Sequence, residues 1–250
     1  MSQSIEANNY LWAVPFLNAP ISSVVEVGSR DGLDAVSLAK ALNCQVTSFE
    51  CDPLQFEVSK ANIMQSGLEG IDILDYALSD VDGELSFWQV DTDIYDNPGT
   101  GSLYEVNFEN RKFDDVDAGR GPIQRKITVP SARFDSLGRP APDLLVMDVQ
   151  GAEVRVLKGF GTLLNSCKFV ICEAERVPSY KGGNAFSELH AYMKRSGFIL
   201  RASTIGNGGR YDRWVNFWRT NLSICLKEKT LTPLKTYQGC FDVIYENKHL

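Results

Sequence analysis

The sequence contains no long apolar run and no closely paired cysteines. None of its apolar stretches approaches the roughly 20 residues needed to span a bilayer. Residues 1–17 lack a cationic segment before their short apolar stretch, which argues against a secretory signal. The six cysteines form no C-x-x-C pair, and a chain of 250 residues is too long to be a disulfide-stapled miniprotein. We therefore expect a cytoplasmic protein with free thiols and no membrane span.

The chain is also short of positive charge. Lys and Arg number 25 against 32 Asp and Glu, which gives a formal net charge of -7. Because an acidic chain binds nucleic-acid phosphates poorly, we expect no nucleic-acid partner. Hydrophobic residues make up 44% of the sequence and charged residues 23%, which is ordinary for a globular protein with a sizeable core. No internal repeat or low-complexity tract is present.

What is present is an alternation of strands and helices. A β-branched run over 24–27 stops at Gly28, and apolar residues then recur at helical spacing over 35–42. A second short strand is predicted at 46–49, and Asp52 followed by Pro53 is typical of a helix start. Leu54, Val58 and Ala61 form the apolar stripe of that helix. Residues 71–78 are a third strand candidate.

The same alternation returns downstream. The pattern predicts strands at Asp143–Asp148 and Lys168–Glu173, each followed by a helix. Phe198–Thr204 and Trp214–Leu222 are expected as late strands, forming an antiparallel pair at the sheet edge. Strand–helix alternation favours an α/β fold, in which a mostly parallel sheet has helices on both faces. We expect one domain over 1–250, with residues 1–20 as an N-terminal extension.

Residues 91–130 break the alternation. They are rich in Asp, Asn, Gly and Pro and have few apolar repeats. We interpret them as a long loop inserted between a strand at 84–90 and a later strand at 126–129. A loop of this length inside a domain is usually functional, so we expect a lid, a substrate-binding element or a contact in a homodimer.

The first group of candidate site residues is the loop from Glu26 to Gly32, which follows a strand and opens a helix. Glycines there let a ligand approach the backbone, and the helix start offers free N–H groups. The spacing is G-x-x-x-G rather than the G-x-G-x-x-G of dinucleotide binders, which disfavours a nicotinamide dehydrogenase. The acidic residues of the loop suit a ligand with cationic groups, such as S-adenosylmethionine; an ordinary strand–helix turn is the alternative. The candidate cofactor-binding residues of this loop are Glu26, Gly28, Ser29, Arg30, Asp31 and Gly32.

Acidic residues also stand at the ends of predicted strands. Glu50 lies 22 residues after Gly28, where a carboxylate can accept both hydroxyls of a ribose; Cys51 follows it. Asp148 and Glu173 end two later strands, and the ligand crevice of an open α/β sheet lies outside such ends. These two could act as a general base and its partner, or as oxygen ligands for a divalent cation.

One run of the sequence resembles a known family. Asp143 to Gly159, DLLVMDVQGAEVRVLKG, is similar to the signature of FkbM-type methyltransferases, and the resemblance extends from Val24 to Phe198. It implies a Rossmann-like class I methyltransferase fold, with a mostly parallel seven-stranded sheet and an antiparallel edge strand. It also implies the cofactor S-adenosylmethionine and, for many members, an acceptor that is a hydroxyl oxygen of a sugar or polyketide.

The resemblance assigns roles to particular residues. It implies that Glu26, Gly28 and Gly32 hold the methionine part of the cofactor and that Glu50 holds the ribose. The remaining implied assignments are that Ala77 and Leu78 border the adenine, that Asp148 lies beside the transferable methyl group, and that residues 101–103 close over the site. The family usually has Ala-Asn where Ser29 and Arg30 stand, and Glu where Gln150 stands.

We therefore expect an S-adenosylmethionine-dependent O-methyltransferase acting on a small-molecule or glycan acceptor. An alkyl hydroxyl needs a base, and the candidates are Asp148, Glu173, Glu175 and His190. His190 shares a helical face with Phe186 and Met193, so a packing role is its alternative. Two further hypotheses are a Mg²⁺-assisted O-methyltransferase using Asp148 and Glu173, and a non-catalytic module that binds the cofactor.

Overall fold

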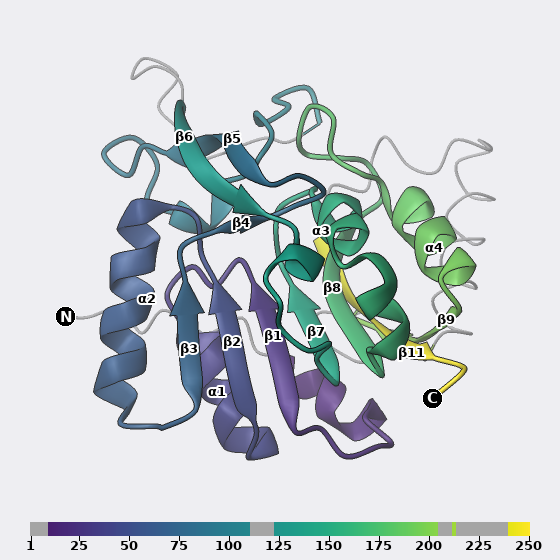
Figure 1. Cartoon of the computed structure of the whole chain (residues 1–250). Helices are drawn as coiled ribbons and strands as arrows, with labels where there is room; N and C mark the ends of the chain where they lie inside the picture. Colours follow the sequence, from purple (N-terminus) through teal and green to yellow (C-terminus); the bar gives the residue numbers. More distant parts are fainter. Residues whose placement is uncertain (1–9, 111–122, 205–211, 214–239) are drawn as a thin grey trace, which may run out of the picture.

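The structure is a computed structural model that describes residues 10–110, 123–204, 212–213 and 240–250. Strands and helices alternate along most of the chain (Figure 1). In chain order, the elements are η1 Tyr10–Phe16, β1 Ser23–Val27, α1 Leu33–Leu42, β2 Gln45–Phe49, α2 Pro53–Ser66, β3 Ile71–Leu74, β4 Ala77–Leu78, β5 Gly83–Val90, η2 Pro98–Thr100, β6 Gln124–Ala132, η3 Phe134–Ser136, β7 Leu144–Met147, α3 Glu153–Gly159, η4 Gly161–Ser166, β8 Phe169–Glu175, α4 Phe186–Arg195, β9 Phe198–Ser203, β10 Asp212–Arg213 and β11 Cys240–Asn247.

The main sheet has the strand order β10-β9-β11-β8-β7-β1-β2-β3. All the pairs from β8 to β3 are parallel, which confirms the predicted α/β fold with a mostly parallel sheet. β11, which the sequence reading missed, runs antiparallel between β8 and β9. The two-residue β10 pairs antiparallel with β9 at the edge of the sheet. The strand expected at Trp214–Leu222 lies outside the described residues.

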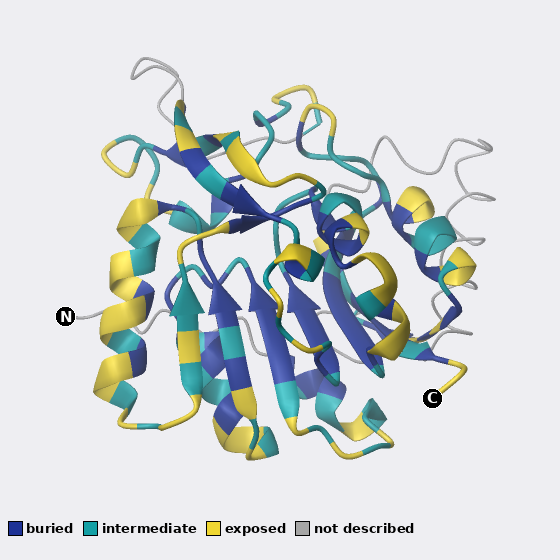
Figure 2. Ribbon diagram, in the orientation of Figure 1, coloured by how far each residue is buried: buried dark blue, intermediate teal, exposed yellow. Residues whose placement is uncertain are grey.

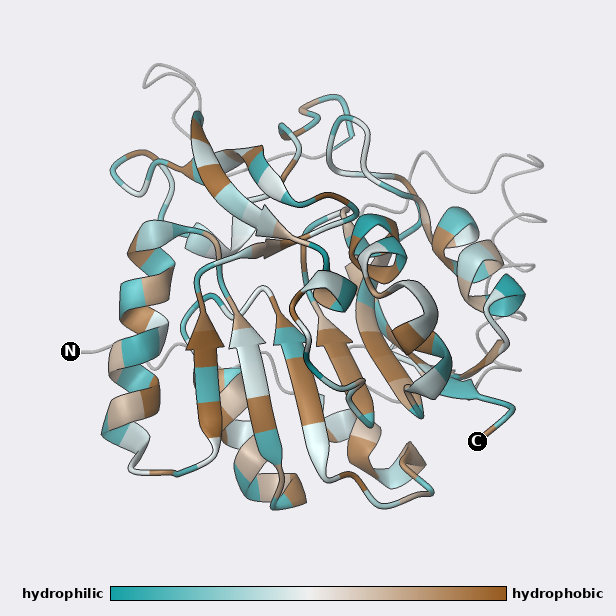
Figure 3. Cartoon of the chain, in the orientation of Figure 1, coloured by the Kyte–Doolittle hydropathy of each residue, from teal (hydrophilic) through white to brown (hydrophobic). Residues whose placement is uncertain are grey.

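Two hydrophobic layers cover the main sheet, one on each face. Neighbouring residues alternate between them: Val24 packs in the layer that contains η1 and α1, and Val25 packs in the layer that contains α3 and α4. Strands that are covered on both faces carry continuous apolar residues, as Leu144–Met147 does. The central strands are accordingly buried (Figure 2) and rich in apolar residues (Figure 3).

Helix α2 turns a different face to the protein from the one the apolar pattern indicated. Leu54 and Val58 are 50% and 43% exposed, and Ala61 is also exposed. The buried positions are Ser59 and Ile63. The helix begins as predicted, because the Asp52 side chain accepts a hydrogen bond from the Leu54 N–H and Pro53 takes the first position. The hydroxyl of Ser59 faces a loop of the main sheet, and this polar contact sets the orientation of the helix.

A second, three-stranded sheet with the order β4-β6-β5 lies beyond the carboxyl ends of β1, β2 and β3 (Figure 1). The single strand predicted at 71–78 was therefore wrong, because β3 belongs to the main sheet and β4 pairs with β6 in the small one. A tight turn, in which the Tyr76 N–H donates to the Leu74 carbonyl, separates the two strands. The strands predicted at 84–90 and 126–129 are confirmed as β5 and β6, and β6 starts two residues earlier than expected, at Gln124.

The segment after β5 is fixed at two points above the main sheet. Ser102 forms an antiparallel bridge with Trp88 of β5, and Val106 forms one with Tyr180. Between β5 and Ser102 the chain makes the short helical turn η2, with the Asn97 side chain capping its start. Within the ranges that the structure describes, no helix is both long and apolar enough to cross a bilayer.

Candidate active site

A cavity of about 490 Å³ lies at the carboxyl ends of β1, β2, β7 and β8, beneath the small sheet and the η2 segment. Its size is within the range of small-molecule sites, and its place is where open α/β sheets bind ligands. Tyr10 near the start of the described chain and Cys240 near its end both contribute to the wall. Thirteen of the residues predicted from sequence line it: Gly28, Ser29, Arg30, Glu50, Cys51, Ala77, Leu78, Gly101, Ser102, Leu103, Asp148, Glu173 and Glu175.

The glycines of the β1–α1 loop are needed for close packing. Gly28 has φ 85°, and a Cβ there would lie 2.0 Å from the carbonyl oxygen of Asp148. Gly32 has φ 76°, and its Cβ would lie 2.9 Å from the Ser59 carbonyl oxygen. Only glycine fits both the left-handed backbone and the space. The loop is thereby held against β7 on one side and α2 on the other.

Hydrogen bonds fix the backbone of Arg30 in an unusual conformation. Its φ of 54° is in the left-handed region, which few residues with long side chains adopt. The Arg30 N–H donates to Glu50 Oε2 at 2.7 Å, and its carbonyl accepts from Ser59 Oγ at 3.0 Å. Asn62 Nδ2 donates to the next carbonyl, that of Asp31, at 2.8 Å. α2 and β2 thus hold this loop together.

Two loop residues act behind the cavity wall. Asp31 accepts from the Leu33 N–H at 3.1 Å and from Arg30 Nη2 at 3.1 Å, so it anchors the start of α1. Glu26 is 2% exposed and accepts a hydrogen bond from the Ser48 hydroxyl on the neighbouring strand. Burial raises the pKa of Glu26 to about 7. Neither carboxylate lines the cavity; Gly32, which also does not line it, packs against α2.

Glu50 and the residues beside it form one end of the cavity. Glu50 Oε1 accepts from the Asp52 N–H at 2.8 Å, while Oε2 holds the Arg30 N–H. The side chain is 7% exposed, and burial raises its pKa to about 7. Next to it is an apolar wall in which Cys51 and Leu103 pack on Ala77 and Phe87. A carboxylate beside an apolar slot offers polar and stacking contacts to one ligand.

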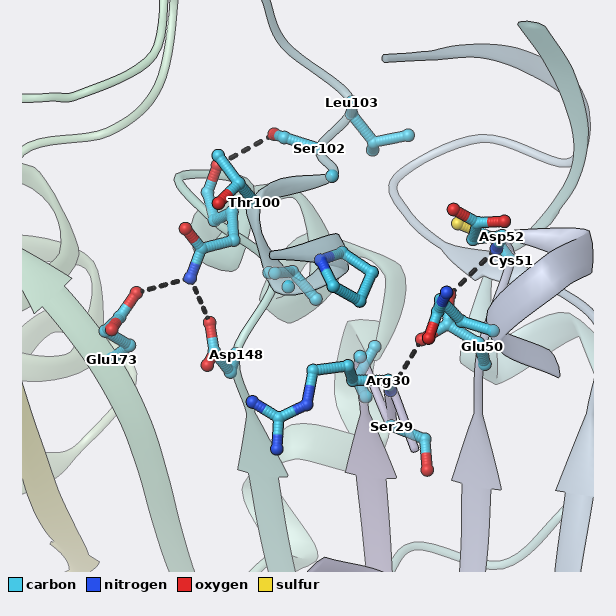
Figure 4. Close-up of a pocket in the computed structure, with 18 of the residues that line it drawn as sticks. Ser29, Arg30, Glu50, Cys51, Asp52, Thr100, Ser102, Leu103, Asp148 and Glu173 are labelled. Carbon is cyan, nitrogen blue, oxygen red and sulfur yellow. Dashed lines mark hydrogen bonds between the residues drawn. The ribbon is translucent and has the colours of Figure 1, made fainter. Parts of the chain in front are cut away.

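The opposite end is an acidic corner, shown in Figure 4. Gln150 Nε2 donates to Asp148 Oδ1 at 2.6 Å and to Glu173 Oε2 at 2.7 Å. Tyr180 fixes the amide, because its hydroxyl donates to Gln150 Oε1 at 2.6 Å. Burial, followed by the charge of Asp148, holds the pKa of Glu173 well above its ordinary value. The two carboxylates that the sequence placed on successive strands are therefore joined by one amide.

The acidic corner is also connected to the segment above it. Ser102 Oγ donates to the Gln150 carbonyl at 2.8 Å, and the Tyr180 hydroxyl lies 3.1 Å from the Thr100 carbonyl oxygen. Gln150 itself has φ 51°, and the following Gly151 has φ 94°. The turn after β7 therefore carries both the carboxylate bridge and the attachment of the η2 segment.

Sequence reasoning missed four residues of this site. Gln150 and Tyr180 form the bridge just described, and Tyr10 reaches the cavity from η1. Asp34, in the first turn of α1, lines the cavity at 7% exposure, and burial raises its pKa to about 8. Its signal was readable, since it lies four positions before the buried Leu38 on the apolar face of the helix.

His190, in contrast, is not part of the site. Its ring stacks on Phe186 and on Tyr245, with centroid distances of 5.5 and 5.9 Å, and Nδ1 lies 3.2 Å from the Tyr245 hydroxyl oxygen. It does not line the cavity. The catalytic assignment of His190 was therefore wrong, and its packing role holds because α4 turns this face onto β11 and not toward the strand ends.

The arrangement of possible metal ligands bears on the Mg²⁺ hypothesis. Over the described ranges, no group of three or more His, Cys, Asp or Glu side chains is arranged to hold a metal ion. Between Asp148 and Glu173 lies the NH₂ group of Gln150, which is a hydrogen-bond donor. The pair therefore presents a bridge between carboxylates rather than an open set of oxygen ligands.

Comparison with known proteins shows which family the chain resembles. Residues 26–200 match the family model described as the methyltransferase FkbM domain. The 2-O-methyltransferase NoeI of Sinorhizobium fredii is 27% identical over 176 residues, which cover 68% of this chain and 70% of that protein. The solved methyltransferase FkbM from Methylobacillus flagellatus KT superposes with a TM-score of 0.50 at 13% identity, covering 77% of this chain and 43% of its own. The chain belongs to the FkbM methyltransferase family, and it is a methyltransferase.

Proposed function

We propose that this methyltransferase uses S-adenosylmethionine and methylates a hydroxyl oxygen of a small molecule or glycan. The observation that carries the proposal is the position of carboxylates at both ends of one cavity, with the buried Glu50 at one end and the half-buried Asp148 and Glu173 at the other. The loop with Gly28 lies between them. Such a cavity offers separate places for a nucleoside and for a cationic group.

The lining residues suit the parts of this cofactor. Each Glu50 oxygen accepts one backbone N–H, and a carboxylate oxygen can accept a further bond, so both ribose hydroxyls can be held. The apolar wall of Cys51, Ala77 and Leu103 suits a flat ring, with Leu78 beside it. Acidic side chains near Asp148 favour a positively charged sulfur. When bound, the cofactor supplies a methyl group on a sulfonium, which is a good electrophile without further activation.

The remaining task of the protein is to align the acceptor and remove its proton. A hydroxyl is a weak nucleophile unless a base accepts that proton. We infer that Glu173 is this base, because burial beside Asp148 raises its pKa toward the range in which a carboxylate takes up a proton effectively. The amide of Gln150 keeps the Glu173 and Asp148 carboxylates at fixed positions, which supports alignment.

Two observations support the acceptor class. The relative NoeI is named a 2-O-methyltransferase, which favours transfer to oxygen. The cavity is lined by six Asp or Glu side chains and, among its described lining residues, by a single Arg. Because such a surface repels phosphates, a neutral hydroxylated acceptor is favoured over a nucleic acid.

Calorimetric titration with S-adenosylhomocysteine and S-adenosylmethionine tests the cofactor assignment. We expect both to bind, and Glu50→Ala to weaken binding by at least about tenfold through loss of charge-assisted hydrogen bonds. Glu84→Ala is the matched control, because Glu84 is an exposed carboxylate on β5. Absence of binding to the parent protein, or equal binding by parent and Glu50→Ala, would contradict the proposal.

A second experiment tests the reaction. A panel of hydroxylated sugars and small molecules is incubated with the protein and labelled cofactor, and methylated products are detected by mass spectrometry. Glu173→Gln is expected to keep cofactor affinity but to lose at least about a hundredfold in turnover, since a base contributes that much. Unchanged turnover in Glu173→Gln removes its role as the base.

Removal of divalent ions provides the test of the Mg²⁺ alternative. Because the Gln150 amide donates to both carboxylates, we expect turnover to be the same with and without EDTA. A loss of activity on chelation that added Mg²⁺ restores would reinstate the metal-assisted reaction.

A further inference from the structure

The charges around the cavity are strongly unequal. Its lining includes the carboxylates of Asp34, Glu50, Asp52, Asp148, Glu173 and Glu175. Among the lining residues that the structure describes, Arg30 alone carries a cationic side chain. A ligand that brings a carboxylate into this cavity therefore meets repulsion everywhere except at Arg30.

We propose that Arg30 and Asp34 form a two-point clamp for an α-amino acid group, with Arg30 pairing the α-carboxylate and Asp34 the α-ammonium. This inference rests on the proposed cofactor, whose methionine part carries both groups. Ser29-Arg30, which stands where the family usually has Ala-Asn, thereby acquires a function in cofactor recognition.

The Arg30 side chain is held in place to serve such a ligand. Its backbone is fixed in the left-handed region by Glu50 and Ser59, and the guanidinium extends into the space beside Asp148 (Figure 4). Asp31 pairs with Nη2 at 3.1 Å, and its side chain is 5% exposed. The Nε–H is buried and has no hydrogen-bond partner in the described part of the chain. A carboxylate that receives bonds from Nε and a terminal nitrogen would fill this need.

Asp34 supplies the acidic half of the clamp, because an ammonium group beside it would favour the ionised form of this buried carboxyl. It lies in the first turn of α1, one residue beyond Leu33, whose N–H donates to Asp31 Oδ1. Its Oδ1 atom is buried and unbonded as far as the described residues show. Asp34 follows the β1–α1 loop, two residues after Gly32, and it lines the same cavity as Arg30. An ammonium group would satisfy the carboxylate, and burial would strengthen the attraction.

Three ligands distinguish the contributions of Arg30 and Asp34 to binding from the contribution of the nucleoside. S-Adenosylhomocysteine carries both the carboxylate and the ammonium. Its decarboxylated analogue keeps only the ammonium, and 5′-methylthioadenosine has neither. Affinities of all three are measured by calorimetry for the parent, Arg30→Ala and Asp34→Asn. Arg139→Ala is the control, because Arg139 pairs with the exposed Asp72 and neither residue lines the cavity.

The clamp predicts a different pattern of affinity losses for each variant. Arg30→Ala is expected to weaken S-adenosylhomocysteine by about 10- to 100-fold while changing the other two ligands by less than about threefold. Asp34→Asn is expected to weaken both ligands with an ammonium and to leave 5′-methylthioadenosine unchanged. Retained binding of 5′-methylthioadenosine also shows that each variant is folded.

Equal losses for all three ligands would overturn the clamp, since they would mean that the substitution disturbs the loop rather than an ionic contact. Equal affinity of the parent for S-adenosylhomocysteine and 5′-methylthioadenosine would also overturn it, while leaving the proposed cofactor in place. Failure of the parent to bind any of the three would refute the proposed cofactor itself, and the clamp with it.

Discussion

At the scale of single residues, the most unusual feature is a set of buried carboxylates. Glu26, Asp34, Glu50 and Glu153 are each 7% exposed or less. Burial raises their pKa values to about 7, 8, 7 and 7, respectively. Each therefore binds a proton more tightly in the folded chain than in the unfolded one. Their stabilising contribution is complete below the ordinary carboxylate pKa and is lost as the pH rises through about 7 to 8.

We accordingly predict that the unliganded protein unfolds at a lower temperature at pH 8.5 than at about pH 5.5. Glu26→Gln should reduce this difference, because the amide cannot ionise beside Asp31 and Asp34; Arg30 offsets only part of that charge. Calorimetry of thermal unfolding between about pH 5.5 and pH 8.5 measures this difference in unfolding temperature. The exposed substitution Glu84→Gln should leave the pH dependence unchanged. Parallel curves for parent and Glu26→Gln would contradict the prediction.

Gly28 is a position at which the surrounding backbone leaves no space for a side chain. Gly28→Ala should destabilise the fold by more than about 3 kcal/mol, because the new methyl group would overlap the Asp148 carbonyl. Gly138 has a similar φ of 66° but open space around its Cβ position, so Gly138→Ala should cost only about 1 kcal/mol of strain. Denaturant unfolding compares the two. Equal losses would mean that backbone strain alone governs Gly28.

At the scale of elements, α2 links the apolar core to the candidate site. Its fully buried Ser59 holds the Arg30 carbonyl, whereas Val58 is 43% exposed. We predict that Ser59→Ala costs about 1 to 2 kcal/mol of stability and weakens cofactor binding, because it leaves a buried carbonyl without its partner. Val58→Ala should change neither quantity measurably. Unfolding curves and calorimetric binding measurements on both variants show whether α2 is held in place by the polar contact of Ser59 or by its apolar residues.

This helix also shows where reading the sequence succeeds and where it fails. The strands at 24–27 and 143–148 were predictable because each is buried on both faces and carries a short apolar run. The orientation of α2 was not, since its buried face is chosen by hydrogen bonds to a loop 29 residues earlier. β11 could have been predicted as a strand from its aromatic and β-branched residues at 241–245. Its position between β8 and β9 could not, because the topology of the sheet sets it.

The candidate site follows the same rule. Gly28, Glu50, Asp148 and Glu173 stand at ends of predictable strands, and the structure brings them to one cavity. The amide bridge depends instead on Tyr180, which lies 30 residues after Gln150 and meets it only through the folded chain. Assigning His190 to the site failed because a histidine on an apolar helix face has a neighbour, Tyr245, that becomes adjacent only when β11 is in place.

At the scale of the whole molecule, the sheet depends on its last described strand. Val243, Ile244 and Tyr245 of β11 are completely buried, and the strand pairs with β8 on one side and β9 on the other. We predict that a chain ending at residue 239 fails to form a cooperative, soluble fold, as measured by circular dichroism and the soluble fraction. A chain ending at Asn247, which removes only exposed residues, should behave like the parent. Cooperative unfolding of the shorter chain would contradict this.

The position of β11 also sets the order of events during biosynthesis. Translation delivers β8 and β9 before the strand that separates them, so two strand edges stay unpaired until β11 leaves the ribosome. Between Ser203 and Cys240 this interval amounts to several seconds at ordinary elongation rates. The unpaired edge of β8, with its apolar side chains, is a site for association with other nascent chains. The proposed base Glu173 lies on that edge, opposite Asp242 of β11, so the candidate site is completed only after β11 has been made.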